Sequence, residues 1–294
     1  MMIPKEFDYV APATLAEALE ALRDNGDAKV LAGGHSLIPA MKLRLAEPSL
    51  LVDLRRIEEL RGVHSQNGHI EIGAMVTHYR LHTEAQLLEG CPLLTECAFS
   101  IGDAQVRARG TLGGSLAHAD PAADLTAAIL ALDGTLVVAG SGDNGEATRE
   151  VPAGDFFVDL LTTALEPGEI VTAVRVPGQT GRSGAAYVKV RNKASHYALV
   201  GAAAVIGLDD DGTCNNIAVA ITGAASKPFR LEQLENDLRG SKLEDDAVQS
   251  TIGKVADMDV AWMSDLFGSE EYRKHLAGVV AGRAIQTARE RVNG

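Results

Sequence analysis

The sequence has few cysteines and no long hydrophobic run, and each shortage excludes a class of protein. The three cysteines, Cys91, Cys97 and Cys214, are an odd number and form no C-x-x-C pair. They give neither a disulfide framework nor a standard zinc or iron–sulfur spacing, so we expect buried thiols, no metal site and a cytoplasmic location. The longest strongly apolar run, residues 197–208, is shorter than the roughly 20 residues that cross a bilayer, and the N-terminus lacks a secretory signal. The sequence therefore predicts no membrane span.

Positive charge and aromatic side chains are also scarce. Lysine and arginine number 27 against 40 aspartates and glutamates, which gives a net charge of −13 with neutral histidine. So acidic a chain repels phosphate backbones and anionic lipid, which excludes nucleic acid and membrane surfaces as expected partners. Glycine, by contrast, is abundant: the 30 glycines among 294 residues exceed the usual share of about 7% and indicate many tight turns.

The length and the local patterns predict two domains. A domain takes roughly 100–200 residues, and the Gly-rich stretch 177–184 is the best candidate for a linker. Before it, a helix over 14–26 begins with a Thr14–Glu17 capping box and presents an apolar face. A small βαβ-like unit follows, with strands at 29–31 and 50–54 around a helix at 37–45.

Further elements follow on both sides of the linker. In the first part we expect strands at 69–74, 136–139 and 170–176, and helices at 77–88, 91–101 and 120–132. In the second part we expect strands at 186–190, 199–208 and 217–222, with an Asp-Gly hairpin turn at 211–212, and helices at 228–239, 244–256 and 269–292.

Two diglycine loops could carry chemistry. The first spans 32–37 and the second spans 110–115; each has paired glycines, a small hydroxyl residue and a helix soon after. Glycine lets the backbone approach a ligand, and a helix start offers unpaired N–H groups to a phosphate. One such loop is commonly only a turn, whereas two suit a pyrophosphate held from both sides. From the residues alone, a dinucleotide site and plain tight turns both stay open. If the site is real, valine at Gly33 or Gly113 would occupy the phosphates' space and leave the fold intact.

Other motifs match functional patterns less well. Residues 140–145 spell G-x-G-x-x-G, but no helix is expected after them, so a solvated hairpin is the better interpretation. Asp53 has the spacing of a ribose-binding acid and is favoured as a strand-end or capping residue. Ser115 resembles the serine of a nucleophile elbow, but its candidate partners are too near in sequence for a triad. His78 and His82 lack the glutamate of a zinc motif and fit a solvated helix face.

Taken together, four segments resemble the FAD-binding medium subunit of molybdenum hydroxylases, the family of the carbon monoxide, aldehyde, xanthine and nicotine dehydrogenases. The first is Pro4-x-x-Phe7-x-Tyr9 at the start of the chain. The two diglycine loops follow with their extensions, and Ser269-x-x-Tyr272-Arg273 lies in the last expected helix. The resemblance covers nearly the whole chain, and within it the dinucleotide interpretation is strongly favoured.

The resemblance implies an α+β fold. A PCMH-type FAD-binding domain would occupy residues 1–177, with subdomains of about 1–57 and 58–177, and a C-terminal domain over 184–294 would pack a small antiparallel sheet on helices. It implies no catalytic residue and no metal ligand in this chain. The implied FAD-binding residues are Ala32, Gly33, Gly34, His35, Ser36, Leu37, Thr111, Gly113, Gly114, Ser115, Asp124, Ile170, Lys189 and Tyr197.

These residues would act in different ways. The backbone N–H groups of 32–37 and 111–115 would hold the pyrophosphate, helped by the hydroxyls of Ser36, Thr111 and Ser115. Asp124 would bind a ribityl or other flavin-side hydroxyl, and Ile170 would lie against the isoalloxazine ring. Lys189 and Tyr197 would lie near the flavin, with a surface strand residue and a core aromatic as their alternative interpretations.

The resemblance also implies partners. A small subunit with [2Fe–2S] clusters would reduce the flavin, a large subunit with the molybdenum cofactor would oxidise the substrate, and an external acceptor such as O₂, NAD⁺ or a quinone would receive the electrons. Two alternatives remain: a stand-alone FAD oxidoreductase, and a flavin-free scaffold subunit that only bridges partners.

Overall fold

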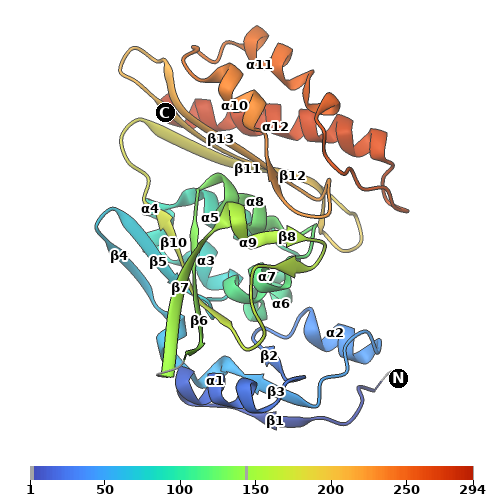
Figure 1. The fold of residues 1–294 in the computed structure, drawn as a ribbon. Coiled ribbons are helices and arrows are strands. Elements are labelled where there is room, and N and C mark those ends of the chain that lie inside the picture. Colours follow the sequence, from blue (N-terminus) through green and yellow to red (C-terminus); the bar gives the residue numbers. More distant parts are fainter. Residues whose placement is uncertain (1–2, 143–144, 294) are drawn as a thin grey trace.

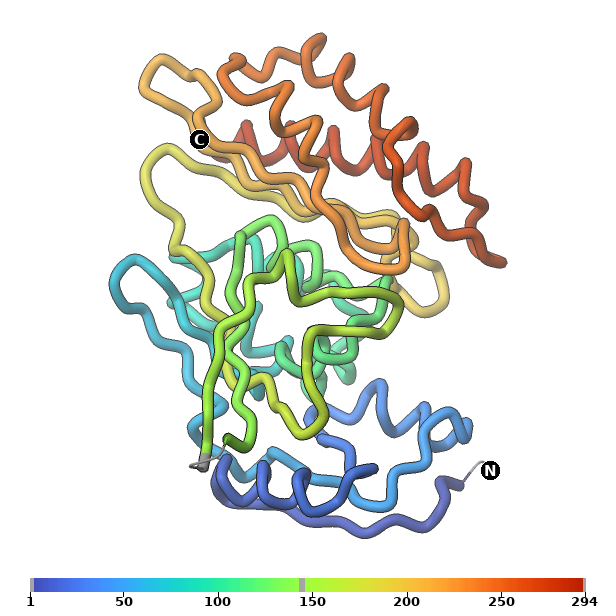
Figure 2. The backbone as a smooth tube through the Cα atoms, in the orientation of Figure 1, coloured from blue at the N-terminus to red at the C-terminus, as the bar shows by residue number. Residues whose placement is uncertain are grey.

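The computed structural model describes residues 3–142 and 145–293, which fold into three stacked parts (Figure 1). A small N-terminal unit lies at one end, a central unit of mixed sheet and helices follows, and a C-terminal sheet covered by helices lies at the other end. The connection over 178–182 carries the chain from the central unit to the C-terminal sheet (Figure 2). Among the described residues, no helix combines the length and apolar character that a membrane crossing requires.

The N-terminal unit is the predicted βαβ-like unit with one strand added. Its three-stranded parallel sheet has the order β1-β3-β2, and the prediction lacked β1. Thr14 caps the first helix by accepting a hydrogen bond from the Glu17 N–H, and the expected apolar face is buried. The elements are β1 (Asp8–Val10), α1 (Leu15–Asp24), β2 (Lys29–Leu31), α2 (Leu37–Lys42) and β3 (Leu50–Asp53).

The central unit pairs five strands in the antiparallel order β4-β5-β10-β6-β7 and packs helices against them. Its strands are β4 (Val63–Gln66), β5 (His69–Gly73), β6 (Thr135–Gly142), β7 (Gly145–Pro152) and β10 (Ile170–Pro177), with a separate pair β8 (Phe157–Asp159) and β9 (Thr162–Thr163). Its helices are η1 (Leu54–Arg56), η2 (Glu58–Arg61), α3 (His78–Thr83), α4 (Ala85–Gly90), α5 (Pro92–Ser100), α6 (Ala104–Arg109), α7 (Leu112–His118), α8 (Asp124–Ala131) and α9 (Ala153–Phe156).

Two predicted helices of this unit are wrong in extent. The helix expected over 77–88 breaks at Glu84, whose ψ of 122° leaves the helical region. The helix expected over 120–132 begins only at Asp124, because the Asp120 carboxylate accepts a hydrogen bond from the Ala122 N–H and holds a turn there. The 140–145 motif lies in the β6–β7 hairpin, as predicted, although Asp143 and Asn144 lie outside the described residues.

The C-terminal unit is a four-stranded antiparallel sheet in the order β11-β12-β13-β14. Helix α12 packs along β11 and β12, while α5 and α8 of the central unit pack against the same sheet and share a core with it. The helix expected over 228–239 starts instead as a short strand. The elements are β11 (Ser183–Arg191), β12 (Ala198–Leu208), β13 (Cys214–Thr222), β14 (Phe229–Arg230), α10 (Glu232–Leu238), α11 (Asp245–Ile252), η3 (Val255–Asp257) and α12 (Glu270–Asn293).

Candidate functional site

The fold brings the two diglycine loops into backbone contact. A Cβ atom on Gly33 would lie 2.8 Å from the Cα of Gly110 and would collide with the carbonyl oxygen of Arg109. A Cβ atom on Gly114 would lie 3.3 Å from the Cβ of Ala32. The loop after β2 and the loop before α7 therefore meet at two points, although they lie far apart in the sequence.

The first loop offers a row of unpaired donors. The backbone N–H groups of residues 33–36 donate to no acceptor among the described residues. Gly34 has a φ of +76°, which glycine adopts without strain, and Ser36 is right-handed helical. Successive unpaired N–H groups in such a turn form a concavity that binds anions. The hydroxyl of Ser36 also has no protein partner among these residues, whereas His35 Nε2 lies 3.3 Å from the Gln105 carbonyl oxygen.

The second loop uses most of its N–H groups within the protein. Gly113 donates to the Ala74 carbonyl oxygen at 2.8 Å, and Gly114 and Ser115 donate to the hydroxyl and carbonyl oxygens of Thr111 at 3.2 and 3.0 Å. Leu112 donates to Val76 at 2.9 Å. The sequence predicted that the N–H groups of 111–115 would bind a pyrophosphate. Of these, the Thr111 N–H stays available, together with the hydroxyl groups of Thr111 and Ser115.

The two glycines singled out from the sequence face protein rather than open space. A Cβ on Gly113 would collide with the Cβ of Ala74 and lie 3.0 Å from its Cα, just as a Cβ on Gly33 would collide with Arg109. The expectation that valine at these positions would leave the fold intact is wrong, because the space it needs is already filled by backbone.

His78 lies beneath the second loop, and its interpretation from the sequence is wrong. Instead of belonging to a solvated helix face, its side chain is buried, and its ring would touch a Cβ placed on Gly110 at 2.6 Å. Its Nδ1 has no hydrogen-bond partner in the described part of the chain. Burial, with a smaller contribution from nearby His35, lowers the pKa of His78 to about 4, so the ring is neutral at physiological pH.

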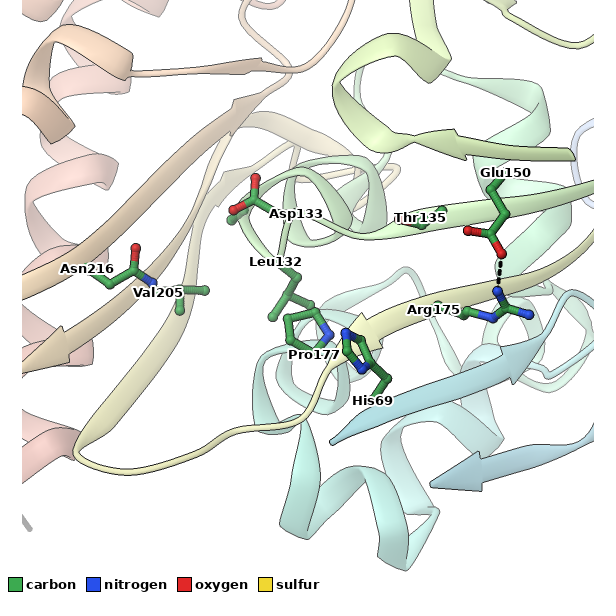
Figure 3. Close-up of a pocket in the computed structure, with 10 residues that line it drawn as sticks. His69, Leu132, Asp133, Thr135, Glu150, Arg175, Pro177, Val205 and Asn216 are labelled. Carbon is green, nitrogen blue, oxygen red and sulfur yellow. Dashed lines mark hydrogen bonds and ion pairs between the residues drawn. The ribbon is translucent and has the colours of Figure 1, made fainter. Parts of the chain in front are cut away.

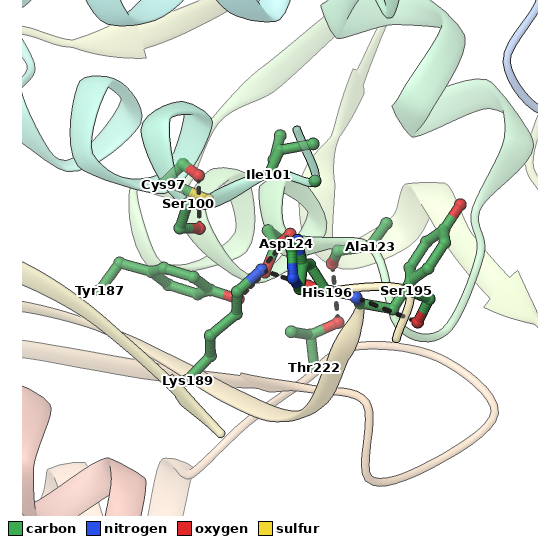
Figure 4. A network of polar contacts seen from close by, with 12 residues as sticks. Cys97, Ser100, Ile101, Ala123, Asp124, Tyr187, Lys189, Ser195, His196 and Thr222 are labelled. Carbon is green, nitrogen blue, oxygen red and sulfur yellow. Dashed lines mark hydrogen bonds and ion pairs between the residues drawn. The ribbon is translucent and has the colours of Figure 1, made fainter. Parts of the chain in front are cut away.

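A second group of predicted residues gathers around Asp124 at the start of α8 (Figure 4). The buried Asp124 carboxylate accepts hydrogen bonds from the Tyr187 hydroxyl at 2.5 Å and from Lys189 Nζ at 3.0 Å. Burial raises the pKa of Asp124, while the Lys189 ammonium acts in the opposite direction. Tyr187 and Lys189 come from β11, so this buried group joins the central unit to the C-terminal sheet.

Tyr197 and Ile170 lie in different surroundings. Tyr197 ends the β11–β12 connection and is 45% exposed. Burial of part of its side chain, followed by the charges of Asp120 and Asp124, raises its pKa. Ile170 is 3% exposed and belongs to a core cluster with Met75. Its predicted contact with a flavin ring stays a prediction, and in this structure its side chain has almost no free surface.

Several interpretations from the sequence are confirmed. Asp53 ends β3 and caps η1 by accepting a hydrogen bond from the Arg55 N–H. All three cysteines are buried and free. Burial raises the pKa of each thiol, to about 12 for Cys91.

Tyr187 is not among the residues predicted from the sequence, although it contacts Asp124. Residues two apart on a strand point to the same face, so a tyrosine and a lysine at 187 and 189 were a signal that both could meet one carboxylate. The partner carboxylate was not predictable in this way, because Asp124 lies on a distant helix.

A cleft lies away from these residues. It measures about 450 Å³ and lies between the central unit and the C-terminal sheet (Figure 3). Its charged lining residues already have ionic partners, since Arg175 pairs with Glu150 and Asp133 pairs with Arg230. Neither diglycine loop lines it, so the cleft does not mark the predicted site.

Two family models together match most of the chain. Residues 5–179 match the family model of the FAD binding domain in molybdopterin dehydrogenase. Residues 185–288 match the CO dehydrogenase flavoprotein C-terminal domain.

Relatives with known names match at nearly full length. The carbon monoxide dehydrogenase medium chain of Afipia carboxidovorans is 38% identical over 291 residues, which cover 99% of each chain. Caffeine dehydrogenase subunit beta of a Pseudomonas species is 33% identical over 99% of this chain and 97% of its own. A solved carbon monoxide dehydrogenase of Hydrogenophaga pseudoflava superposes with a TM-score of 0.93 at 39% identity and 99% coverage of both chains. The chain belongs to the family of FAD-binding medium subunits of molybdenum hydroxylases, a family of oxidoreductases.

Proposed function

We propose that this chain passes electrons from the iron–sulfur clusters of a small partner subunit, through FAD, to an external acceptor. A large partner subunit with the molybdenum cofactor would oxidise the substrate. The support comes from the relatives, which are named as medium chains or subunits of dehydrogenases. Three free, buried cysteines fit a reducing compartment, and we propose the cytoplasm.

One observation of this structure carries the proposal: the N–H groups at 33–36, and the hydroxyl of Ser36 beside them, have no hydrogen-bond partner among the described residues. A diphosphate is an anion that needs several donors, and four consecutive N–H groups here lack an acceptor within residues 3–142 and 145–293. The residues present therefore fit the phosphate part of FAD. FAD, when bound, can take up electrons singly from clusters and deliver them singly or in pairs to an acceptor.

The individual residues receive separate roles in this proposal. The N–H groups of residues 33–36 and the hydroxyl of Ser36 would bind the pyrophosphate, with Thr111 and Ser115 adding hydrogen bonds from the second loop. Lys189, Tyr197 and Ile170 would lie on the side of the isoalloxazine ring. No residue of this chain would act as an acid or base, because the protein's task is to bind and orient the cofactor.

The experiment is to purify the chain together with its native partners and to replace Ser36 by aspartate. The wild-type complex should release FAD on denaturation, whereas Ser36→Asp should lose FAD because a carboxylate would face the diphosphate. Its clusters should still be reduced by substrate, but electrons should no longer reach the acceptor. Ser250→Asp, on the exposed face of α11, is the control and should behave as wild type.

Two outcomes would contradict the proposal. A wild-type complex without FAD would favour the flavin-free scaffold, and isolation of the chain from its source as a lone, active flavoenzyme would favour the stand-alone oxidoreductase.

A further inference from the structure

The hairpin turn between β8 and β9 exposes two leucines, one of them in an unfavourable backbone conformation. Leu160 and Leu161 form the tip of the turn, and Leu161 has a φ of +51°, a left-handed conformation in which glycine or asparagine is preferred. Each leucine is 52% exposed, and neighbouring Val158 is 49% exposed. The turn therefore loses stability through backbone strain and again through apolar exposure. Strain of this kind persists where a function requires it.

Hydrogen bonds and packing hold this turn in place. The Leu160 N–H donates to Asp159 Oδ1 at 2.7 Å, and the Thr162 hydroxyl donates to the Leu160 carbonyl oxygen at 2.9 Å. The Asp159 side chain is also hydrogen-bonded to the Ser226 side chain of the C-terminal unit. On the other side, β9 packs against α7, the helix that begins in the second diglycine loop. The exposed leucines are therefore fixed close to the candidate phosphate site.

A second exposed apolar turn lies just before α12. Leu266 is fully exposed and Phe267 is 65% exposed. The Asp265 carboxylate holds the turn by accepting the Phe267 N–H at 2.8 Å. Buried Arg273 in turn donates to Asp265 Oδ2 and to the Leu199 carbonyl oxygen, both at 2.6 Å. A buried arginine thus fixes this turn to the start of β12 while its two apolar side chains point into solvent.

The two turns belong to one side of the molecule, the side on which the flavin ring is proposed to lie. In Figure 1 the β8–β9 hairpin, the β11–β12 connection and the start of α12 all lie on the right of the view. The loop over 224–228 links the two turns. Its Ser226 binds Asp159 of the first turn. Its Ala225 forms an isolated β-bridge with Trp262, shortly before the second turn. The exposed side chains of these turns form what we term the apolar edge: Val158, Leu160, Leu161, Leu266 and Phe267.

The charge beside the apolar edge indicates what kind of partner covers it. Arg191 and Lys193, on the β11–β12 connection, are exposed and form no ion pair with another residue in 3–142 or 145–293, although the chain has a net charge of −13. An iron–sulfur cluster held by thiolates carries negative charge, and it must come close to a flavin that it reduces. A second copy of this chain would instead bring cations against cations in a symmetric contact. Apolar side chains beside unpaired cations therefore fit an acidic iron–sulfur partner.

We propose that the apolar edge is the surface on which the small iron–sulfur subunit docks, with Arg191 and Lys193 at its rim. Docking would bury the five apolar side chains, which gives the strained turn at Leu161 and the exposed turn at Leu266 a function. The identity of the partner rests on the proposed function, whereas the existence of a docking surface does not.

The first test identifies the occupant in the complex purified with its native partners. The photoreactive substitution Leu160→p-benzoylphenylalanine should give, on illumination, a cross-link to the small subunit that mass spectrometry identifies. The same substitution at Leu88, which is also 52% exposed and lies on α4 at the opposite side of Figure 1, should give no cross-link to that subunit. A cross-link from position 160 to the large subunit or to a second copy, or no cross-link at all, would overturn the proposal. FAD released from the same sample tests the proposed function separately.

The second test measures affinity. The double variant Leu160→Ser, Leu266→Ser removes apolar surface from both turns, so it should raise the Kd of the small subunit at least tenfold while FAD content stays that of wild type. Leu88→Ser should leave the Kd unchanged. An unchanged Kd in the double variant, or an equal rise in the control, would refute docking at the apolar edge.

A third test examines the strain at Leu161. Glycine adopts this backbone conformation without strain, whereas alanine keeps the strain. Leu161→Gly should therefore have a higher denaturation midpoint than Leu161→Ala in the chain without its partners, while both variants raise the Kd alike because both lack the leucine side chain. A lower midpoint for Leu161→Gly, or a wild-type Kd in both variants, would contradict the proposal.

Discussion

Gly33 and Gly110 pack backbone against backbone, and this contact joins the two diglycine loops. No side chain fits between them, because a Cβ on Gly33 would lie 2.8 Å from the Cα of Gly110. We therefore expect Gly33→Ala to lower the free energy of unfolding of the flavin-free protein by about 1–3 kcal/mol, and to reduce FAD content as well. Chemical denaturation measures the first effect and released flavin the second.

The control for this variant is Gly26→Ala. Gly26 follows α1 and has no atom within 4 Å of an added Cβ, so alanine there should be neutral or slightly stabilising. Equal stability of the two variants would show that the loops are not held by this contact.

His78 should make stability depend on pH. Its pKa is about 4 in the folded protein and 6.5 in the unfolded chain, so the unfolded chain takes up the proton first as the pH falls. The free energy of unfolding is therefore unaffected by His78 above pH 6.5. As the pH falls toward 4, protonation of this residue in the unfolded chain lowers that free energy by about 3 kcal/mol in total. Denaturation curves between pH 7 and 4 should show a smaller loss for His78→Leu than for wild type. Parallel curves for the two proteins would refute a buried, neutral His78.

Ser36→Ala should weaken FAD binding without harming the fold. The hydroxyl makes no hydrogen bond to any residue that the structure describes, so its loss breaks none of these contacts. A hydrogen bond to a charged phosphate contributes about 1.5–3 kcal/mol, which corresponds to at least a tenfold rise in Kd. Flavin titration of the deflavinated complex gives the Kd, with Ser250→Ala as the exposed control. An unchanged Kd would exclude the Ser36 hydroxyl from the site.

The thiols should be unreactive while the protein is folded. Burial raises the pKa of Cys91 to about 12, and Cys97 and Cys214 are buried as well. At pH 8 only about one Cys91 in ten thousand is a thiolate, and reagents cannot reach it. A disulfide reagent should therefore titrate three thiols in denaturant and almost none in buffer. Fast reaction of the folded protein would contradict the buried placement.

Much of the architecture follows from local patterns. The capping residue and apolar spacing of α1, the Asp-Gly turn between β12 and β13 and the long antiparallel strands after residue 183 all appear as predicted. These features depend on neighbours in sequence, so a periodic pattern is enough to specify them. Helix ends were less predictable, since at Glu84 and Asp124 a single backbone torsion or side-chain hydrogen bond decides where the helix stops or starts.

By itself, then, the sequence determined many of the strands, most of the longer helices and the two loops whose glycines permit a phosphate site. Only the tertiary structure decided that the loops touch, that His78 is buried beneath one of them, and that Lys189 reaches across to Asp124. The physical reason is that each of these contacts joins residues from separate elements. Burial and electrostatic pairing between such residues depend on how the units pack, and no local pattern records that packing.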